Sequence, residues 1–195
     1  MDQSSYYIIY KKNNKMTTEK LEYKNIDDIN FISSLIEKVL NKKPYIHKLL
    51  YRASRDGDSS FAFHRNCQGI PNTVVIIETI KGNKFGGFTS KIWDTSGDYK
   101  YDEKCFLFSL DKRQIYYNKD PEISIVCLKN KGPIFGRGND IYIEDNCMRN
   151  NQNFTVQSSF YYREENYALN NEKYFTVKDY DVYQVDFGDY TIIER

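Results

Sequence analysis

One stretch near the N-terminus carries apolar residues at helical spacing. They recur every three or four positions, at Ile29, Ile32, Ile36, Val39 and Leu40. Asn25 is placed to cap the start of a helix, because its side chain can accept a hydrogen bond from a free backbone N–H. Pro44 is expected to stop the helix, since proline has no N–H to continue it. The pattern therefore predicts a helix between Asn25 and Pro44.

A second, shorter helix is predicted from about Ser60 to Cys67. Asp58 or Ser59 can cap its start, and Gly69 and Pro71 are typical of the chain just beyond a helix. The side chains expected to share its buried face are Phe61, His64 and Cys67.

Most of the remaining chain has the short, turn-bounded apolar runs of β-strands. Residues 73–81 and 84–93 flank Gly82-Asn83, which predicts a tight hairpin with a two-residue connection, because glycine adopts positive φ freely. Residues 11–20 are polar and predict a flexible connection. Further strands are predicted at residues 6–10, 105–110, 114–118, 124–129, 140–144, 158–163 and 180–186.

These elements predict an α+β, mainly β, fold: a two-sheet antiparallel β-sandwich with a few short flanking helices. Aromatic residues make up 16% of the chain, which suits a pleated, half-buried surface better than a helical bundle. We expect an N-terminal strand and helix segment at residues 1–44, followed by the sandwich domain at residues 45–195.

The charge of the chain is balanced. Its 195 residues include 28 Lys plus Arg and 27 Asp plus Glu, so no field is expected that would attract nucleic acid or an anionic membrane. The apolar runs are far shorter than the roughly 20 residues that cross a bilayer, and residues 1–12 have no signal-peptide pattern. We therefore expect a cytoplasmic protein with no integral membrane segment and no nucleic-acid partner.

No cofactor or metal site is predicted. The four cysteines form no CxxC pair, and residues 140–145 lack the alternating oxygen ligands of a calcium loop. The SRDG segment contains Ser54, yet neither His47 nor His64 belongs to a recognisable Ser-His-Asp arrangement. We interpret SRDG as a turn before the second helix, and His64 as a hydrogen-bonded core residue rather than a general base.

Five segments together resemble the TLDc family. They are KLLYRASRDGDSSFAFHRNCQG (residues 48–69), GNKFGGFTSKIW (82–93), CFLFSL (105–110), GPIFGRGNDIYIEDN (132–146) and FTVKDYDVYQVD (175–186). The resemblance extends over roughly residues 45–187, and the SRDG and DIYIEDN forms are similar to the protist branch. It implies a two-sheet antiparallel sandwich, protection from oxidative stress and direct binding to the vacuolar-type proton-pumping ATPase. It implies no catalytic mechanism.

The same segments have physical explanations. Glycine inside a strand usually marks a bulge or a close approach by a neighbouring element, and glycine in a loop permits backbone angles closed to other residues. Trp93 is expected to be buried beside the phenylalanines of its segment. The residues assigned a structural role are Gly57, Gly86, Gly87, Trp93, Gly136 and Gly138.

A partner is expected to contact loops, because loops project from a rigid sandwich without disturbing its core. The candidate contact residues lie in SRDG and GRGND: Arg55, Asp56, Arg137 and Asp140. We therefore expect a non-enzymatic protein that binds subunits of the vacuolar-type pump at its cytoplasmic surface and regulates its activity or assembly.

Two alternatives remain open. A thiol-dependent antioxidant would need an exposed cysteine with a depressed pKa, and Cys147, in a loop beside Asp145 and Arg149, is the candidate. A glycan-binding sandwich would use its tyrosine-rich faces to stack on sugars. Peroxide consumption that depends on Cys147 would favour the first, and binding on a glycan array would favour the second.

Overall fold

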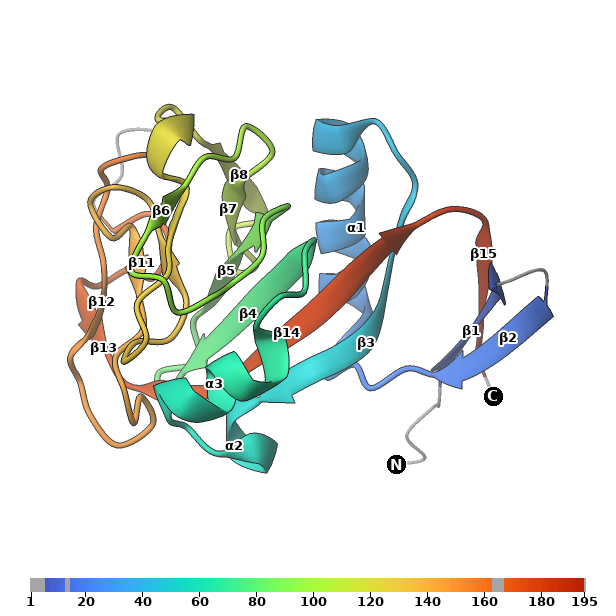
Figure 1. Cartoon of the computed structure of the whole chain (residues 1–195), viewed down its shortest axis with the longest axis horizontal. Coiled ribbons are helices and arrows are strands. Elements are labelled where there is room, and N and C mark those ends of the chain that lie inside the picture. Colours follow the sequence, from blue (N-terminus) through green and yellow to red (C-terminus); the bar gives the residue numbers. More distant parts are fainter. Residues whose placement is uncertain (1–5, 13–14, 163–166, 195) are drawn as a thin grey trace.

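The computed structural model describes residues 6–12, 15–162 and 167–194. In these ranges the strands form two six-stranded sheets and one three-stranded sheet, and all the pairings within the sheets are antiparallel (Figure 1). The main core lies between the two six-stranded sheets. The predicted mainly β sandwich is therefore confirmed.

The main sheet contains the longest strands. Its order is β3 (Pro44–Arg52), β14 (Val177–Phe187), β4 (Thr73–Thr79), β5 (Lys84–Thr89), β7 (Phe106–Ser109) and β8 (Gln114–Tyr117). The second sheet is built from short strands, in the order β13 (Tyr174–Phe175), β12 (Asn153–Thr155), β11 (Ile141–Tyr142), β10 (Ile134–Phe135), β9 (Ile125–Val126) and β6 (Tyr99–Lys100). A 3₁₀ turn, η1 (Pro121–Ile123), precedes β9.

The third sheet joins the two ends of the chain. Its order is β15 (Tyr190–Glu194), β1 (Tyr6–Lys12) and β2 (Lys15–Lys20). The strand predicted at residues 6–10 is confirmed. The flexible connection predicted at residues 11–20 is wrong, because β2 is a six-residue strand that pairs with β1. Its polar residues tolerate solvent, since ladder hydrogen bonds rather than burial hold the strand.

Helix α1 (Ile26–Leu40) packs on the face of the main sheet opposite the second sheet. Asn25 caps it as predicted, with its Oδ1 accepting a hydrogen bond from Asp28 N at 3.0 Å. The helix ends at Leu40, the last position of the predicted apolar pattern and before Pro44. Asn41, which follows, adopts the left-handed conformation (φ 51°), and Pro44 begins β3.

Helices α2 (Ala53–Asp56) and α3 (Ser60–Cys67) follow β3. Ser59 caps α3, its Oγ accepting a hydrogen bond from Ala62 N. Phe61 does not share the buried face: its side chain is exposed, and Phe63 packs in the core instead. None of the helices in the described ranges is long and apolar enough to cross a membrane.

The predicted hairpin forms, with a longer connection than expected. Residues 80–83 join β4 to β5, and Gly82 takes the positive φ of 87° that the turn requires. The strand predicted at residues 158–163 is wrong where the chain is described. It is reduced to an isolated bridge between Phe160 and Asn118, because Asp140 accepts the N–H groups of Ser158 and Ser159. Residues 163–166 lie outside the described residues.

Two glycines in β5 allow close packing on both sides of the strand. A Cβ on Gly86 would overlap the backbone oxygen of Val75 in β4, and a Cβ on Gly87 would lie 2.7 Å from Leu107 Cδ2 and 2.8 Å from Phe135 Cε1. The pairing of β4 with β5 keeps its register through both residues. The predicted close approach, rather than a bulge, is therefore the reason for glycine here.

Trp93 is fully buried, as predicted. It lies beyond the end of β5, where its backbone bridges Gln68. Its ring makes edge contacts with Phe63 and Phe135, with ring centroids 5.5 Å apart in both pairs. Its Nε1 donates a hydrogen bond to Thr73 Oγ1 at 2.9 Å, so the polar atom of the indole is paired inside the core.

Candidate functional site

The SRDG segment forms α2 and the turn that follows it. Ser54 donates from both its N and Oγ to Asp179, at 2.9 and 2.7 Å, so its hydroxyl is not bonded to a histidine. Arg55 binds Asp56 through Nε and Nη2 at 3.0 and 2.8 Å, which raises the pKa of Arg55 and lowers that of Asp56. Gly57 takes a φ of 98°. The segment is therefore held by its internal Arg55–Asp56 pair and by hydrogen bonds to Asp179 in β14.

The residues that directly follow SRDG bind the loop that follows β11. The Asp58 carboxylate binds the Arg149 guanidinium, and its backbone oxygen accepts from Cys147 N at 3.2 Å. Ser60 donates from N and Oγ to Asp145 Oδ1, at 2.7 and 2.9 Å. These contacts join residues about 85 to 91 positions apart in the sequence. They give the two segments a clear structural role.

The GRGND turn connects β10 to β11. Gly136 adopts a φ of 83°, and a Cβ on either Gly136 or Gly138 would overlap neighbouring side chains, those of Asp140 and Ser158. Glycine is required at both positions for this reason. The turn also lies against η1, because Gly136 N donates to Ser124 O at 2.9 Å.

Asp140 is a buried anchor and not a surface contact, which corrects its assignment to the interface. Its carboxylate accepts hydrogen bonds from Ser158 N at 2.8 Å, from Ser159 N at 2.9 Å and from Tyr162 Oη at 3.0 Å. Burial raises the pKa of Asp140, and the hydrogen bonds oppose that rise. Its role is to fix the turn beneath Arg137.

Arg137 is the exposed side chain of this turn. More than half of its side chain is accessible, and its Nε lies 2.5 Å from Asp120 Oδ2. The Asp120 carboxylate raises the pKa of Arg137, and Glu122 and Tyr99 add to the rise. Tyr99 is 62% exposed. An exposed arginine beside an exposed tyrosine has the composition of protein-binding surfaces.

The structure does not bring the two predicted loops together. In Figure 1, α2 with the SRDG segment lies at the bottom of the molecule, whereas η1, drawn in yellow beside the GRGND turn, lies at the top. Arg55 and Arg137 therefore belong to different surfaces.

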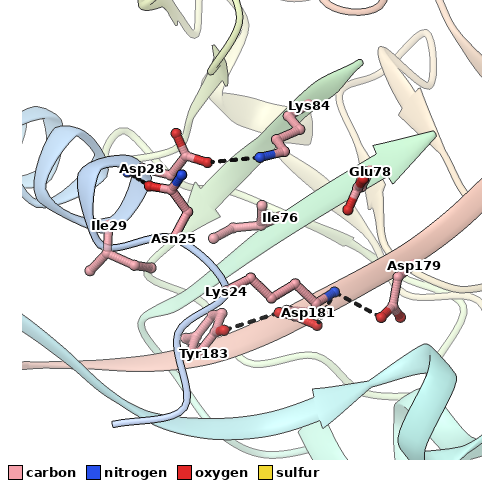
Figure 2. A pocket seen from close by; sticks show the side chains of 10 residues that line it. All are labelled: Lys24, Asn25, Asp28, Ile29, Ile76, Glu78, Lys84, Asp179, Asp181 and Tyr183. Carbon is pink, nitrogen blue, oxygen red and sulfur yellow. Dashed lines mark hydrogen bonds and ion pairs between the residues drawn. The ribbon is translucent and has the colours of Figure 1, made fainter. Parts of the chain in front are cut away.

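A groove beside the N-terminal end of α1 was not predicted (Figure 2). It is lined by Lys24, Asn25, Asp28, Ile29, Ile76, Glu78, Lys84, Asp179, Asp181 and Tyr183. These side chains come from the residues just before α1, from its first turn, and from β4, β5 and β14 of the main sheet. The alternation of Asp179, Asp181 and Tyr183 along β14 was a usable signal, because residues two apart point to one face of a strand.

The charged side chains of the groove are ion-paired, some with one another and some with cations outside its lining. Asp181 accepts from Arg52 Nε and Nη2, both at 2.8 Å, and lies 3.1 Å from Lys24 Nζ. Burial raises the pKa of Asp179, but the bonds from Lys24 and Ser54 bring it below its ordinary value. The two remaining carboxylates also have cationic partners: Asp28 binds Lys84 and Arg113, and Glu78 binds Lys178. This network ties α1 to the sheet.

All four cysteines are buried, which overturns the expectation of an exposed Cys147. Burial raises the pKa of the Cys147 thiol to about 12 and that of Cys127 to about 11. It also raises the pKa of Cys67 and of Cys105. A reactive thiol needs solvent access and a lowered pKa, whereas these four thiols are buried and have raised pKa values.

His64 is buried in α3. Its Nε2 lies 2.9 Å from Leu128 O and 3.1 Å from Lys131 O, and a carbonyl oxygen can only accept, so Nε2 carries the proton. This fits the predicted hydrogen-bonded core residue. Nowhere in the described ranges do three His, Cys, Asp or Glu side chains gather closely enough to hold a metal ion.

Comparison with known proteins adds a family and two relatives. The chain matches the family model of the TLDc domain over residues 21–186. The MTOR-associated protein MEAK7 of Danio rerio is 32% identical over 63 residues, which are 32% of this chain and 14% of that protein. Its counterpart in Gallus gallus is 34% identical over 89 residues, 44% of this chain and 18% of that protein. The matched part covers less than a fifth of either relative.

Proposed function

Because the chain belongs to the TLDc domain family, we propose that it is a non-enzymatic protein that binds the vacuolar-type proton-pumping ATPase. In this proposal it regulates the activity or assembly of the pump from the cytoplasmic side and contributes to oxidative-stress resistance. The observation that carries the proposal is the family match, which covers residues 21–186 and so most of the sandwich. The relatives are named for association with mTOR, which supports a protein partner in general.

The corner around Arg137 is the contact surface that we propose. Its guanidinium projects from a turn that buried Asp140 fixes, so little side-chain or loop ordering is needed on binding. Tyr99 beside it adds a large ring that loses little conformational entropy. Arg55 is a weaker candidate, because 39% of its side chain is accessible, against 57% for Arg137.

The surroundings of the candidate catalytic groups, the Ser54 hydroxyl and the cysteine thiols, support a non-enzymatic role. The Ser54 hydroxyl donates to Asp179, and the thiols are buried with raised pKa values. The thiol-dependent antioxidant, which needs an exposed cysteine, therefore gains no support from the site.

The proposal is tested by an affinity pull-down. The 195-residue chain is immobilised, and the pump subunits that it retains from an extract of the native cell are measured by mass spectrometry. Arg137→Glu is expected to abolish retention with little change in Tm, because exposed substitutions usually change stability by about 0.5 kcal/mol or less. Arg65→Glu, the same charge change on an exposed residue of α3, is the matched control and should retain the subunits.

Three outcomes would contradict parts of the proposal. If the parent chain retains no pump subunit, the pump is not the partner, and retention of mTOR-complex subunits instead would identify another one. If folded Arg137→Glu binds as well as the parent, the interface lies elsewhere. If Arg137→Glu unfolds, the residue is structural.

A further inference from the structure

The three-stranded sheet lies outside the part of the chain that matches the family. Strands β1 and β2 precede residue 21, and β15 follows residue 186. Figure 1 shows this sheet projecting from one side of the main sheet, joined to β14 by a short turn. One face is anchored to the domain by a small cluster of Ile8, Tyr10, Leu21 and Tyr45, with Tyr190 and Ile192 packed against it. Its two edge strands are β15 and β2.

The hydrogen bonding of β1 fixes which backbone groups face each neighbour. Leu21 N donates to Tyr6 O at 2.8 Å, so the backbone groups of Tyr6 point toward β2. In an antiparallel strand the N–H and C=O of a residue point to one side, and the side alternates along the strand. Those of Tyr7 and Ile9 therefore point toward β15.

This alternation identifies the free edge of β15. Tyr7 pairs with Ile193 and Ile9 with Thr191, so the backbone groups of Ile193 and Thr191 bond to β1. The β15 residues whose N–H and C=O groups point outward are Tyr190, Ile192 and Glu194. No other described strand pairs with this edge.

The two edges of the sheet differ in sequence. Strand β2 begins and ends with a lysine, at Lys15 and Lys20, and lysine on an edge strand opposes pairing with another chain. Strand β15 reads Tyr-Thr-Ile-Ile-Glu, with β-branched and aromatic residues at four positions and no lysine. An unpaired edge of this composition is a template for strand addition.

We propose that β15 pairs antiparallel with β15 of a second copy of this chain, about a two-fold axis at Ile192. Two three-stranded sheets then join into one of six strands. In this register Ile192 faces its own copy and exchanges two N–H···O bonds with it, because its backbone groups point outward. Thr191 lies opposite Ile193, and Tyr190 lies opposite Glu194, so no like charges face each other.

Sedimentation equilibrium of the 195-residue chain over a wide range of protein concentration tests this inference. The parent is expected to approach twice the mass of one chain. Ile192→Pro removes the outward N–H without removing a bond to β1, and proline is tolerated on an edge strand at such positions. Because of the two-fold axis, the substitution removes two hydrogen bonds from the interface. The dissociation constant of the dimer is therefore expected to rise about tenfold or more.

Two matched controls accompany it. Ile192→Val is close to proline in size and keeps the N–H. Thr18→Pro removes an outward N–H from β2, the other edge strand of the sheet. Thr17 and Glu19 bond to β1, so the backbone groups of Thr18, which lies between them, point away from β1. Both are expected to dimerise as the parent does. A parent that stays monomeric at every concentration overturns the inference, and so does a dimer that only Thr18→Pro disrupts.

If Ile192→Pro fails to fold, cysteine cross-linking tests the proposed β15–β15 pairing instead. Opposed Cα atoms in a hydrogen-bonded antiparallel pair lie about 5.5 Å apart, within the range of a disulfide. Ile192→Cys is therefore expected to give a disulfide-linked dimer on mild oxidation, whereas Thr191→Cys, opposite Ile193, is not. The four native cysteines are buried and do not compete. Absence of the Ile192→Cys dimer, or equal cross-linking of both variants, would refute the register. This inference is independent of the pump proposal.

Discussion

Arg149 pairs side-on with Asp58, its Nη2 lying 2.7 Å from Oδ1 and its Nε 3.1 Å from Oδ2. The two residues lie 91 positions apart in the sequence, and their contact joins the loop after β11 to the turn between α2 and α3. The guanidinium holds the pKa of Asp58 below its ordinary value. The pair is therefore a pH-dependent contribution to stability.

Arg149→Met is expected to lose that contribution. A carboxyl whose pKa is depressed on folding stabilises the fold above its unfolded pKa, about 3.9, and the effect disappears as the pH falls through the folded value. The difference between parent and variant in free energy of unfolding should be present at pH 7 and shrink below about pH 4. Urea unfolding across this range measures it. Arg65→Met is the control, and a difference between parent and Arg149→Met that stays constant with pH would contradict the assignment.

Trp93→Ala is expected to destabilise the chain by about 3 kcal/mol or more, because a fully buried indole leaves a large cavity. Trp93→Phe should cost less, since it keeps an aromatic ring and loses mainly the hydrogen bond to Thr73. Urea unfolding followed by circular dichroism measures both variants. In the parent, the emission of the single tryptophan should shift to longer wavelength on unfolding. Emission at the wavelength of free indole in the native state would show that Trp93 is exposed.

Gly86→Ala is expected to destabilise the chain more than Gly87→Ala. A Cβ on Gly86 meets the backbone of Val75, which cannot move without breaking the β4–β5 pairing. A Cβ on Gly87 meets side chains of Leu107 and Phe135, which can shift, so its cost should stay within the about 1–3 kcal/mol of ordinary overpacking. Thermal unfolding ranks the two variants. Equal stability of the two variants would contradict the prediction. It would mean that the backbone of the main sheet can shift to accommodate a Cβ at Gly86.

The elements that local chemistry specifies were predictable. The start of α1 followed from Asn25, and its extent followed from the apolar spacing up to Leu40. Asn41, the left-handed residue that terminates the helix, was not identified, because asparagine is a weaker stop signal than Pro44. Strand β2 was missed because its residues are polar, and its pairing with β1 cannot be seen in its own composition.

The candidate site was predictable only in part. The exposed position of Arg137 followed from a glycine-rich turn, but the burial of Asp140 depends on Ser158, Ser159 and Tyr162, which lie about twenty positions further along the chain. Cys147 looked accessible for the same reason, since the loop that holds it is covered by distant segments. Contacts of this kind are set by the tertiary fold.

The buried thiols give a direct test of the antioxidant alternative. A thiolate is the reactive form, and the pKa of about 12 for Cys147 and about 11 for Cys127 leaves almost none at neutral pH. We expect a thiol-specific colorimetric reagent to label the native chain slowly, at a rate set by opening of the core, and all four cysteines quickly in urea. Native protein with a thiol reductant should consume no peroxide above the rate of its Cys147→Ser variant. Rapid labelling of one native thiol, lost in Cys147→Ser together with peroxide turnover, would show that this loop opens in solution and would restore the redox mechanism.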